Sequence, residues 1–158
     1  MRPIVIDSRE QTPWSFPPYV PTTIGTLKNG DYALQGDPQF SIERKSAGDF
    51  LGTISSGWGR FCRELNRMDA AGYSIKVIIV EGDLSLFTFS GAGEHLSPPC
   101  HEHYMCSPQF VFKRIAELTM RGASVLFASD PELASALALR ILIEREKELE
   151  NGNNCECE

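Results

Sequence analysis

The sequence has no long apolar run, and this absence excludes the commonest membrane architecture. No stretch approaches the ~20 consecutive apolar residues of a membrane-spanning helix. The opening residues, MRPIVIDSRE, lack the basic and then apolar pattern of a secretory signal. We therefore expect a cytoplasmic protein without a membrane partner.

Neither a disulfide framework nor a basic surplus is present. The five cysteines are an odd number, and Cys155 and Cys157 lie in a polar end segment, so we expect reduced thiols. Lysine and arginine total 15 against 21 aspartate and glutamate, a net charge of −6 that argues against indiscriminate nucleic-acid binding. A local basic face remains compatible with this balance, and so does a metal site built from carboxylates.

The sequence also shows no internal repeat and no linker. Its 158 residues predict a single domain over 1–150 and a disordered polar tail over 151–158. Turn signals and apolar periodicity predict strands in 3–10, 32–34, 40–45, 73–83 and 123–130, and helices beginning near 46, 59, 107 and 130. This order favours an α/β fold with a central mixed sheet flanked by helices.

Four acids and a lysine fall at or just beyond the predicted strand ends: Asp7, Asp31, Glu43, Lys45 and Asp49. Carboxylate oxygens suit Mg²⁺, which assists phosphodiester hydrolysis, and a nearby lysine can act on the attacking water. The alternatives are structural. Glu43 and Lys45 alternate onto one strand face as a surface ion pair would, Asp31 and Asp7 suit turns, and Asp49 suits a helix cap with Ser46.

Five segments in order, IVIDSRE, NGDYAL, FSIERKSAGDF, GRF and IIVEGD, resemble the nuclease domain of the XPF/MUS structure-specific endonuclease family. The family signature is G-D followed by E-R-K-x-x-x-D, which Gly30-Asp31 and residues 43–49 fit without a gap. The resemblance implies a restriction-endonuclease-like core. It also implies Mg²⁺- or Mn²⁺-dependent cleavage of DNA at branched or flap structures, in repair or recombination, and hence a DNA-associated location.

By this resemblance, Asp31 and Glu43 are metal ligands, and Lys45 acts on water. Asp49 and Asp7 are supporting acids near the metal. Arg44 lies on the opposite strand face, where we expect it to hold neighbouring acids or backbone in place, and Glu10 is a weaker supporting candidate.

Two features depart from the family pattern. The sequence has no helix-hairpin-helix module or helicase domain, and Trp58 replaces a short polar turn. Substrate choice is therefore open, and the small size suggests a phage or mobile-element protein.

Three arginines recur at helical spacing: Arg60, Arg63 and Arg67. They are candidates for contacts to DNA phosphates, and the alternative is a solvated face beside Glu64 and Asp69. The final helix has Leu133, Leu137 and Ile141 on one side and further apolar residues around it, which predicts a homodimer through this region.

A zinc site is the weakest prediction. Cys100, His101, His103 and Cys106 have zinc-type side chains, but their spacing is too crowded for common zinc motifs. A small metal-binding regulator is therefore the least favoured function. A non-catalytic DNA-binding or scaffold subunit that partners an active nuclease is the main alternative to an enzyme, although such a subunit has no need of the acid–acid–lysine set.

Overall fold

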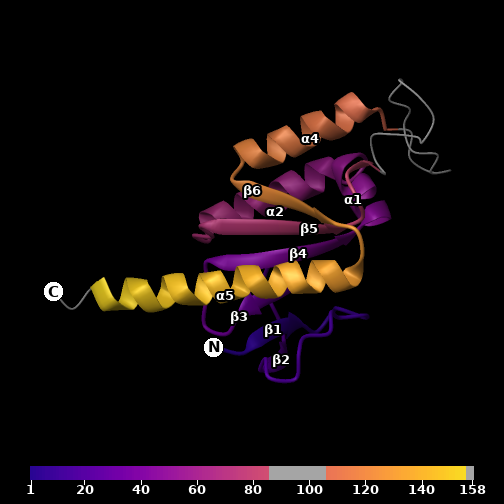
Figure 1. Ribbon diagram of the computed structural model, residues 1–158. Coiled ribbons are helices and arrows are strands. Elements are labelled where there is room, and N and C mark those ends of the chain that lie inside the picture. The colour runs from indigo at the N-terminus through magenta and orange to yellow at the C-terminus, as the bar shows by residue number, and fades with distance from the viewer. Residues whose placement is uncertain (86–105, 156–158) are drawn as a thin grey trace.

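The computed structural model describes residues 1–85 and 106–155, which form a six-stranded sheet between two layers of helices (Figure 1). The strand order is β2-β1-β3-β4-β5-β6. The strands are β1 (Ile4–Asp7), β2 (Thr22–Gly25), β3 (Tyr32–Leu34), β4 (Phe40–Ser46), β5 (Ile75–Glu81) and β6 (Ala123–Ala128). β3 runs antiparallel to both β1 and β4, whereas the other neighbours are parallel. The mixed α/β sheet predicted from the sequence is confirmed.

The helices are α1 (Ala47–Ile54), α2 (Trp58–Ala70), α4 (Pro108–Met120) and α5 (Pro131–Cys155). α5 crosses one face of the sheet, and α1, α2 and α4 lie on the other side (Figure 1). Two apolar clusters result, one on each face of the sheet. The β4 residues Phe40 and Ile42 belong to the α5 side, whereas Ile78 and Val80 of β5 belong to the α1–α2 side.

Three of the helices, α1, α4 and α5, begin where capping side chains predicted them. Ser46 and Ser107 are the N-caps of α1 and α4, and their hydroxyls accept hydrogen bonds from the backbone N–H groups of Asp49 and Phe110. Asp130 accepts the N–H of Leu133 at 2.8 Å, which satisfies a donor in the first turn of α5. Caps of this kind fix the strand-to-helix corner at Ser46, directly after the charged segment of β4.

Strand β2 was not predicted. It pairs in parallel with β1 at the edge of the sheet, where Ile24 is 75% exposed. Its sequence, TTIG, is short and follows a proline-rich segment, so no local apolar alternation marks it. Residues 22–25 therefore form a strand because they pair with β1.

Helix α5 differs from its prediction in two respects. Its fully buried residues are Ala134, Ala138 and Leu142, while Leu133 is 54% exposed. Small side chains at i and i+4 let the helix lie close to the sheet, and apolar periodicity alone does not show which stripe of the helix does so. The helix also continues to Cys155, into the segment predicted as a disordered tail, because each added residue gains a helical hydrogen bond. The division into one domain and a tail stays a prediction.

No helix among the described residues has the length and apolar character needed to cross a membrane.

Candidate active site

The register of the sheet brings the predicted acids of three strands together. Asp31 precedes β3, and the pairing of Tyr32 with Ile42 places Asp31 opposite Glu43. The backbone N–H of Asp7 donates to the carbonyl of Asp31 at 2.9 Å, so Asp7 follows in the same row. Residues directly opposite in a sheet project from the same face. This face is the one covered by α1 and α2.

Asp31 is held in place by the glycine before it. Gly30 has φ +73°, and a Cβ at this position would lie 2.7 Å from Ser41 Cβ, so a side chain is excluded both by backbone conformation and by space. Asp31 Oδ2 accepts the backbone N–H of Arg44 at 2.8 Å. Burial, followed by the nearby charge of Glu43, raises the pKa of Asp31 to about 7. The negative charge of this pair is therefore not fully compensated by the protein.

Glu43 and Lys45 form an ion pair on the same face. Lys45 Nζ lies 2.5 Å from Glu43 Oε1, and both side chains are largely buried. The ammonium also lies 5.9 Å from the centre of the Phe61 ring of α2. Burial lowers the pKa of Lys45, but the carboxylates of Glu43, Asp31 and Glu64 raise it more, so Lys45 is a firmly charged cation in the absence of metal.

Asp7 is buried and fully engaged in a turn. Its Oδ1 accepts from the Arg9 backbone N–H at 2.9 Å and from Arg9 Nε at 2.6 Å. Its Oδ2 accepts from the Leu27 N–H at 2.7 Å and from Arg9 Nη2 at 3.2 Å. The hydrogen bond from the Arg9 side chain, partly opposed by burial, lowers the pKa of Asp7 to about 2. These contacts favour the turn-stabilising alternative for Asp7.

Arg9 was not predicted as a site residue, although its charge acts on the site. Asp31 and Glu43 both help to raise its pKa. Its two-residue separation from Asp7 is a turn pattern that occurs widely, so the sequence offered no signal for this role.

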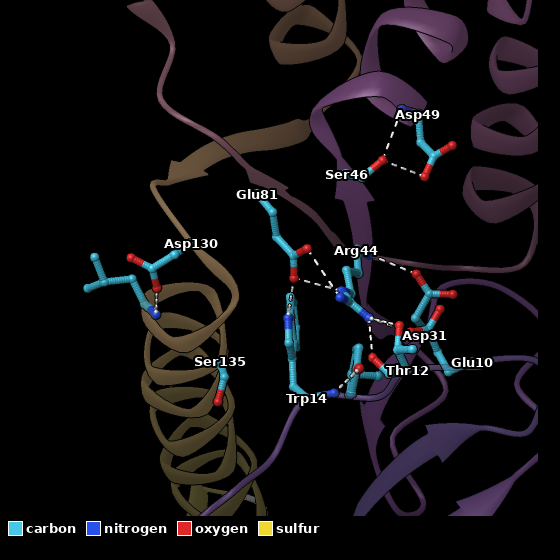
Figure 2. A network of polar contacts seen from close by, with 12 residues as sticks. Glu10, Thr12, Trp14, Asp31, Arg44, Ser46, Asp49, Glu81, Asp130 and Ser135 are labelled. Carbon is cyan, nitrogen blue, oxygen red and sulfur yellow. Dashed lines mark hydrogen bonds and ion pairs between the residues drawn. The ribbon is translucent and has the colours of Figure 1, made fainter. Parts of the chain in front are cut away.

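Arg44 occupies the opposite face of β4, as strand alternation predicted (Figure 2). Its guanidinium lies 2.7 Å from Glu81 Oε1 and 3.1 Å from Glu10 Oε2, and it donates to the carbonyl of Thr12 at 2.5 Å. Trp14 Nε1 donates to the same Glu81 oxygen at 2.6 Å. Arg44 thus ties the end of β4 to the end of β5 and to the segment after β1.

Glu10 enters the site through this network. It pairs with Arg44, and its charge contributes to the raised pKa of Asp31. Glu10 therefore lies near the metal-ligand candidates, while its own carboxylate pairs with Arg44. Neither Glu81 nor Trp14 was predicted, because each meets Arg44 across more than 25 residues of sequence.

Asp49 lies apart from this network at the start of α1 (Figure 2). Its Oδ2 accepts the Ser46 hydroxyl at 2.7 Å, and its backbone N–H donates to Ser46 Oγ at 3.1 Å. This reciprocal arrangement is the helix cap that the sequence also allowed. Asp49 and Arg44 both line an open polar cavity of about 310 Å³. The geometry supports the capping role and leaves a direct role in catalysis as a prediction.

The three arginines of α2 are exposed, but they are not equivalent. Arg60 and Arg67 lie close enough to Glu64 to lower its pKa, whereas the Arg63 guanidinium lies near Gly59. Glu64 itself is half-buried, and its pKa is raised by burial and then by Glu43. In the sequence Glu64 stood out only as a neighbour of the three arginines, in the alternative that their face is solvated. The docking of α2 beside β4 is what brings Glu64 near the site.

The carboxylates of Asp31 and Glu43 fit one hard divalent cation that is held by few protein ligands. Among the described residues no group of three or more His, Cys, Asp or Glu side chains is arranged as a metal site. Mg²⁺ commonly uses only one or two carboxylates, with water and substrate phosphate completing its shell. Asp31 and Glu43 each have one oxygen that accepts no hydrogen bond from a described residue. Their crowded negative charge favours a cation there.

Three of the four zinc candidates, Cys100, His101 and His103, lie outside the described residues. Cys106 is described, and it is a buried free thiol whose pKa is raised by burial.

Comparison with known proteins agrees with this geometry. A sequence model of the ERCC4 domain matches residues 6–140. Two solved structures of XPF from Aeropyrum pernix are similar in fold, one in complex with DNA (TM-score 0.66, 21% identity) and one without (TM-score 0.64, 22% identity). The alignments with these two structures cover 94% and 93% of this chain. They cover 66% and 68% of the XPF chains, so this chain spans about two thirds of their length. A search of curated proteins found no match.

The match to the ERCC4 domain extends over most of the sequence, from β1 into α5. It includes the row of acids, the Glu43–Lys45 pair and the arginines of α2. The six-stranded mixed sheet with helices on both faces is the restriction-endonuclease-like arrangement of the Aeropyrum pernix structures. The chain belongs to the ERCC4 domain family and has the fold of the XPF structures.

Proposed function

We propose that this protein is a divalent-metal-dependent DNA endonuclease that hydrolyses phosphodiester bonds. The observation that carries the proposal is the pair of facing carboxylates, Asp31 and Glu43, with Lys45 Nζ 2.5 Å from Glu43. Family membership supports it, because the E-R-K segment, residues 43–45, lies within the matched region.

Asp31 and Glu43 are the residues that would hold Mg²⁺ or Mn²⁺. A bound cation supplies a polarised phosphoryl oxygen and a water of lowered pKa. The raised pKa of Asp31 supports this assignment, since burying two like charges is costly unless a counter-ion accompanies them.

Lys45 is the proposed catalytic residue that orients the attacking water or steadies developing negative charge. The remaining candidates act less directly. Arg44, paired with Glu10 and Glu81, fixes the end of β4, and the hydrogen bond from its backbone to Asp31 orients that carboxylate. Asp7 stabilises the turn beside Asp31, and Asp49 supports the start of α1.

DNA is the proposed substrate. One of the similar Aeropyrum pernix XPF structures was solved in complex with DNA. The exposed Arg60, Arg63 and Arg67 of α2 flank the site and provide a local basic face despite the net charge of −6. Contacts of this type are made to phosphates and weaken with salt. Branched and flap structures, and a role in DNA repair or recombination, follow from the family resemblance.

We also propose a homodimer through α5. Leu133 is 54% exposed, and Phe40, Ile75 and Ile141 line an open cavity of about 210 Å³ beside the same helix. Light scattering at micromolar concentration is expected to give twice the mass of one chain, and a monomer mass would contradict the proposal.

The function is tested by cleavage of labelled duplex, single-stranded, 3′-flap, fork and four-way-junction DNA in Mg²⁺, Mn²⁺ and EDTA. We expect cutting with either metal, no cutting in EDTA, and a preference for the branched substrates. Binding of branched DNA without cutting of any substrate would instead support the scaffold-subunit alternative.

A further inference from the structure

Among the described residues, Glu64 of α2 is a carboxylate beside the site to which neither metal binding nor catalysis has been assigned. It is half-buried, in the same turn as the buried Phe61 and Leu65. Glu64 and Glu43 line one small cavity of about 10 Å³ between α2 and the sheet, and the charge of Glu43 helps to raise the pKa of Glu64, so the two carboxylates lie near each other. Among described residues Glu64 forms no ion pair. It is therefore a charged group close to the site with its pairing capacity unused.

Lys45 is the cation that this carboxylate can reach. Its ammonium lies 5.9 Å from the centre of the Phe61 ring, and Phe61 is one helical turn before Glu64. The charge of Glu64 is among those that raise the pKa of Lys45. Lys45 thus pairs with a carboxylate of its own strand, Glu43, and is also within the electrostatic influence of a carboxylate of α2, Glu64.

The two neighbours of Lys45 differ in their availability once metal binds. Glu43 Oε1 accepts from Lys45 in the structure, and as a metal ligand the same carboxylate is drawn to the cation. Asp31, the other nearby acid, is a proposed ligand as well. Asp7 is already saturated by Arg9 and Leu27. Glu64 is the remaining carboxylate near Lys45 in the described chain.

We propose that Glu64 is a positioning residue that holds the Lys45 ammonium beside the reaction centre when Glu43 turns to the metal. This inference rests on the proposed function, because only a cation at Glu43 releases Lys45 from its present partner. The alternative role for Glu64 is structural, as a spacer between the exposed Arg60 and Arg67. The two roles predict different results, because a spacer acts on DNA binding and a positioning residue acts on the chemical step.

The first test follows the Lys45 amine without DNA. Its rate of acetylation by acetic anhydride is measured by mass spectrometry in EDTA and in Mg²⁺, for the wild type, Glu64→Ala, Glu64→Gln and Glu150→Ala. The last removes an exposed glutamate near the C-terminal end of α5 as a charge-matched control. Lys113, an exposed lysine of α4, is the internal reference.

In EDTA the labelling of Lys45 in Glu64→Ala is expected to exceed that in the wild type only slightly, because Glu43 still pairs with Lys45 and Glu64 contributes least to its raised pKa. In Mg²⁺, labelling of Lys45 in Glu64→Ala is expected to rise by about fivefold over the wild type, the effect of one lost ion pair. Glu64→Gln is expected to lie between them, because an amide oxygen still accepts a hydrogen bond. Equal labelling of Lys45 in the wild type and Glu64→Ala in Mg²⁺ would overturn the inference.

The second test separates binding from chemistry in DNA cleavage. Glu64→Ala is expected to lower kcat by about 10- to 100-fold, the effect of one charge-assisted hydrogen bond, with KM for DNA changed little. Glu64→Gln is expected to restore part of kcat. A change in KM alone would assign Glu64 to the arginine face and overturn the inference.

The two proposals fail in distinguishable ways. A wild type that cuts DNA in Mg²⁺, with Glu64→Ala cutting and labelling as the wild type does, removes the role of Glu64 and leaves the endonuclease intact. A wild type that cuts no DNA and whose Lys45 labelling does not respond to Mg²⁺ in any variant overturns both.

Discussion

Arg44 and Lys45 are consecutive residues of β4 that serve opposite faces of the sheet. The Arg44 guanidinium lies 2.7 Å from Glu81 on the side covered by α5, and Lys45 Nζ lies 2.5 Å from Glu43 on the side covered by α2. Because successive side chains of a strand point to opposite faces, Arg44 joins the network that links neighbouring strands. Lys45, the next residue, belongs to the Glu43–Lys45 pair that is proposed to act on DNA.

Replacement of Arg44 by alanine is expected to destabilise the fold. The change leaves Glu81 and Glu10 without their largely buried cation and removes a hydrogen bond to the carbonyl of Thr12. A loss of about 2–3 kcal/mol in the free energy of unfolding follows, or roughly 5–10 °C in melting temperature. Calorimetry measures the loss, and Arg63→Ala, which removes an exposed arginine of α2, is the control and is expected to melt within a few degrees of the wild type. Equal melting of Arg44→Ala and the wild type would contradict the structural role.

Gly30→Ala tests how Asp31 is positioned. The position combines φ +73° with a Cβ that would lie 2.7 Å from Ser41, whereas Gly36 has φ +82° and no atom within 4 Å of its Cβ. Gly36→Ala is expected to cost about 1 kcal/mol for the backbone conformation alone. Gly30→Ala is expected to cost clearly more, and to weaken Mg²⁺ binding measured by isothermal titration calorimetry. Equal effects of the two changes would show that the close approach to Ser41 is unimportant.

Asp31→Asn is expected to stabilise the metal-free protein at neutral and alkaline pH. The pKa of Asp31 is raised to about 7 in the fold, from an ordinary value of 3.8. Between these values the folded state binds the extra proton, so wild-type stability falls as pH rises from about 4 to 7. The asparagine variant does not lose this stability. Melting curves in EDTA are expected to match near pH 4 and to favour the variant above pH 7. A variant that melts lower at pH 8 would refute the assignment of uncompensated charge.

Asp7→Asn is expected to behave in the opposite way. The pKa of Asp7 is lowered to about 2 by Arg9, so its contribution is complete above about pH 4 and is lost as pH falls toward 2. The melting temperature of Asp7→Asn should lie below that of the wild type at pH 7, and the gap should close in acid. Mg²⁺ binding is expected to persist, since the Asp7 oxygens are already occupied. Loss of Mg²⁺ binding with unchanged stability would restore Asp7 to the metal site.

Residues close together in the sequence account for the features of the site that local patterns predicted. Glu43 and Lys45 share a face because strands alternate, and Ser46 begins α1 because a serine followed by Asp49 is a local capping signal. The fold class followed similarly from the order of apolar strands and capped helices. Each of these inferences needs only a few adjacent residues.

The residues that sequence reasoning missed depend on contacts between distant segments. Glu81 and Trp14 meet Arg44 only after β5 and the segment following β1 have been placed beside β4. Glu64 turns toward Glu43 only because α2 docks on that side of the sheet. Strand β2 exists only through its pairing with β1.

The most direct test of the account is the single-turnover rate of cleavage of a 3′-flap DNA in Mg²⁺ by the wild type and by Lys45→Ala, with enzyme in excess. The account predicts that both proteins fold and bind the DNA equally well. The variant should cut at least ~100-fold more slowly, the usual effect of a residue that acts on a transferred proton. Equal cleavage rates would contradict the assignment of the chemistry to the Glu43–Lys45 pair.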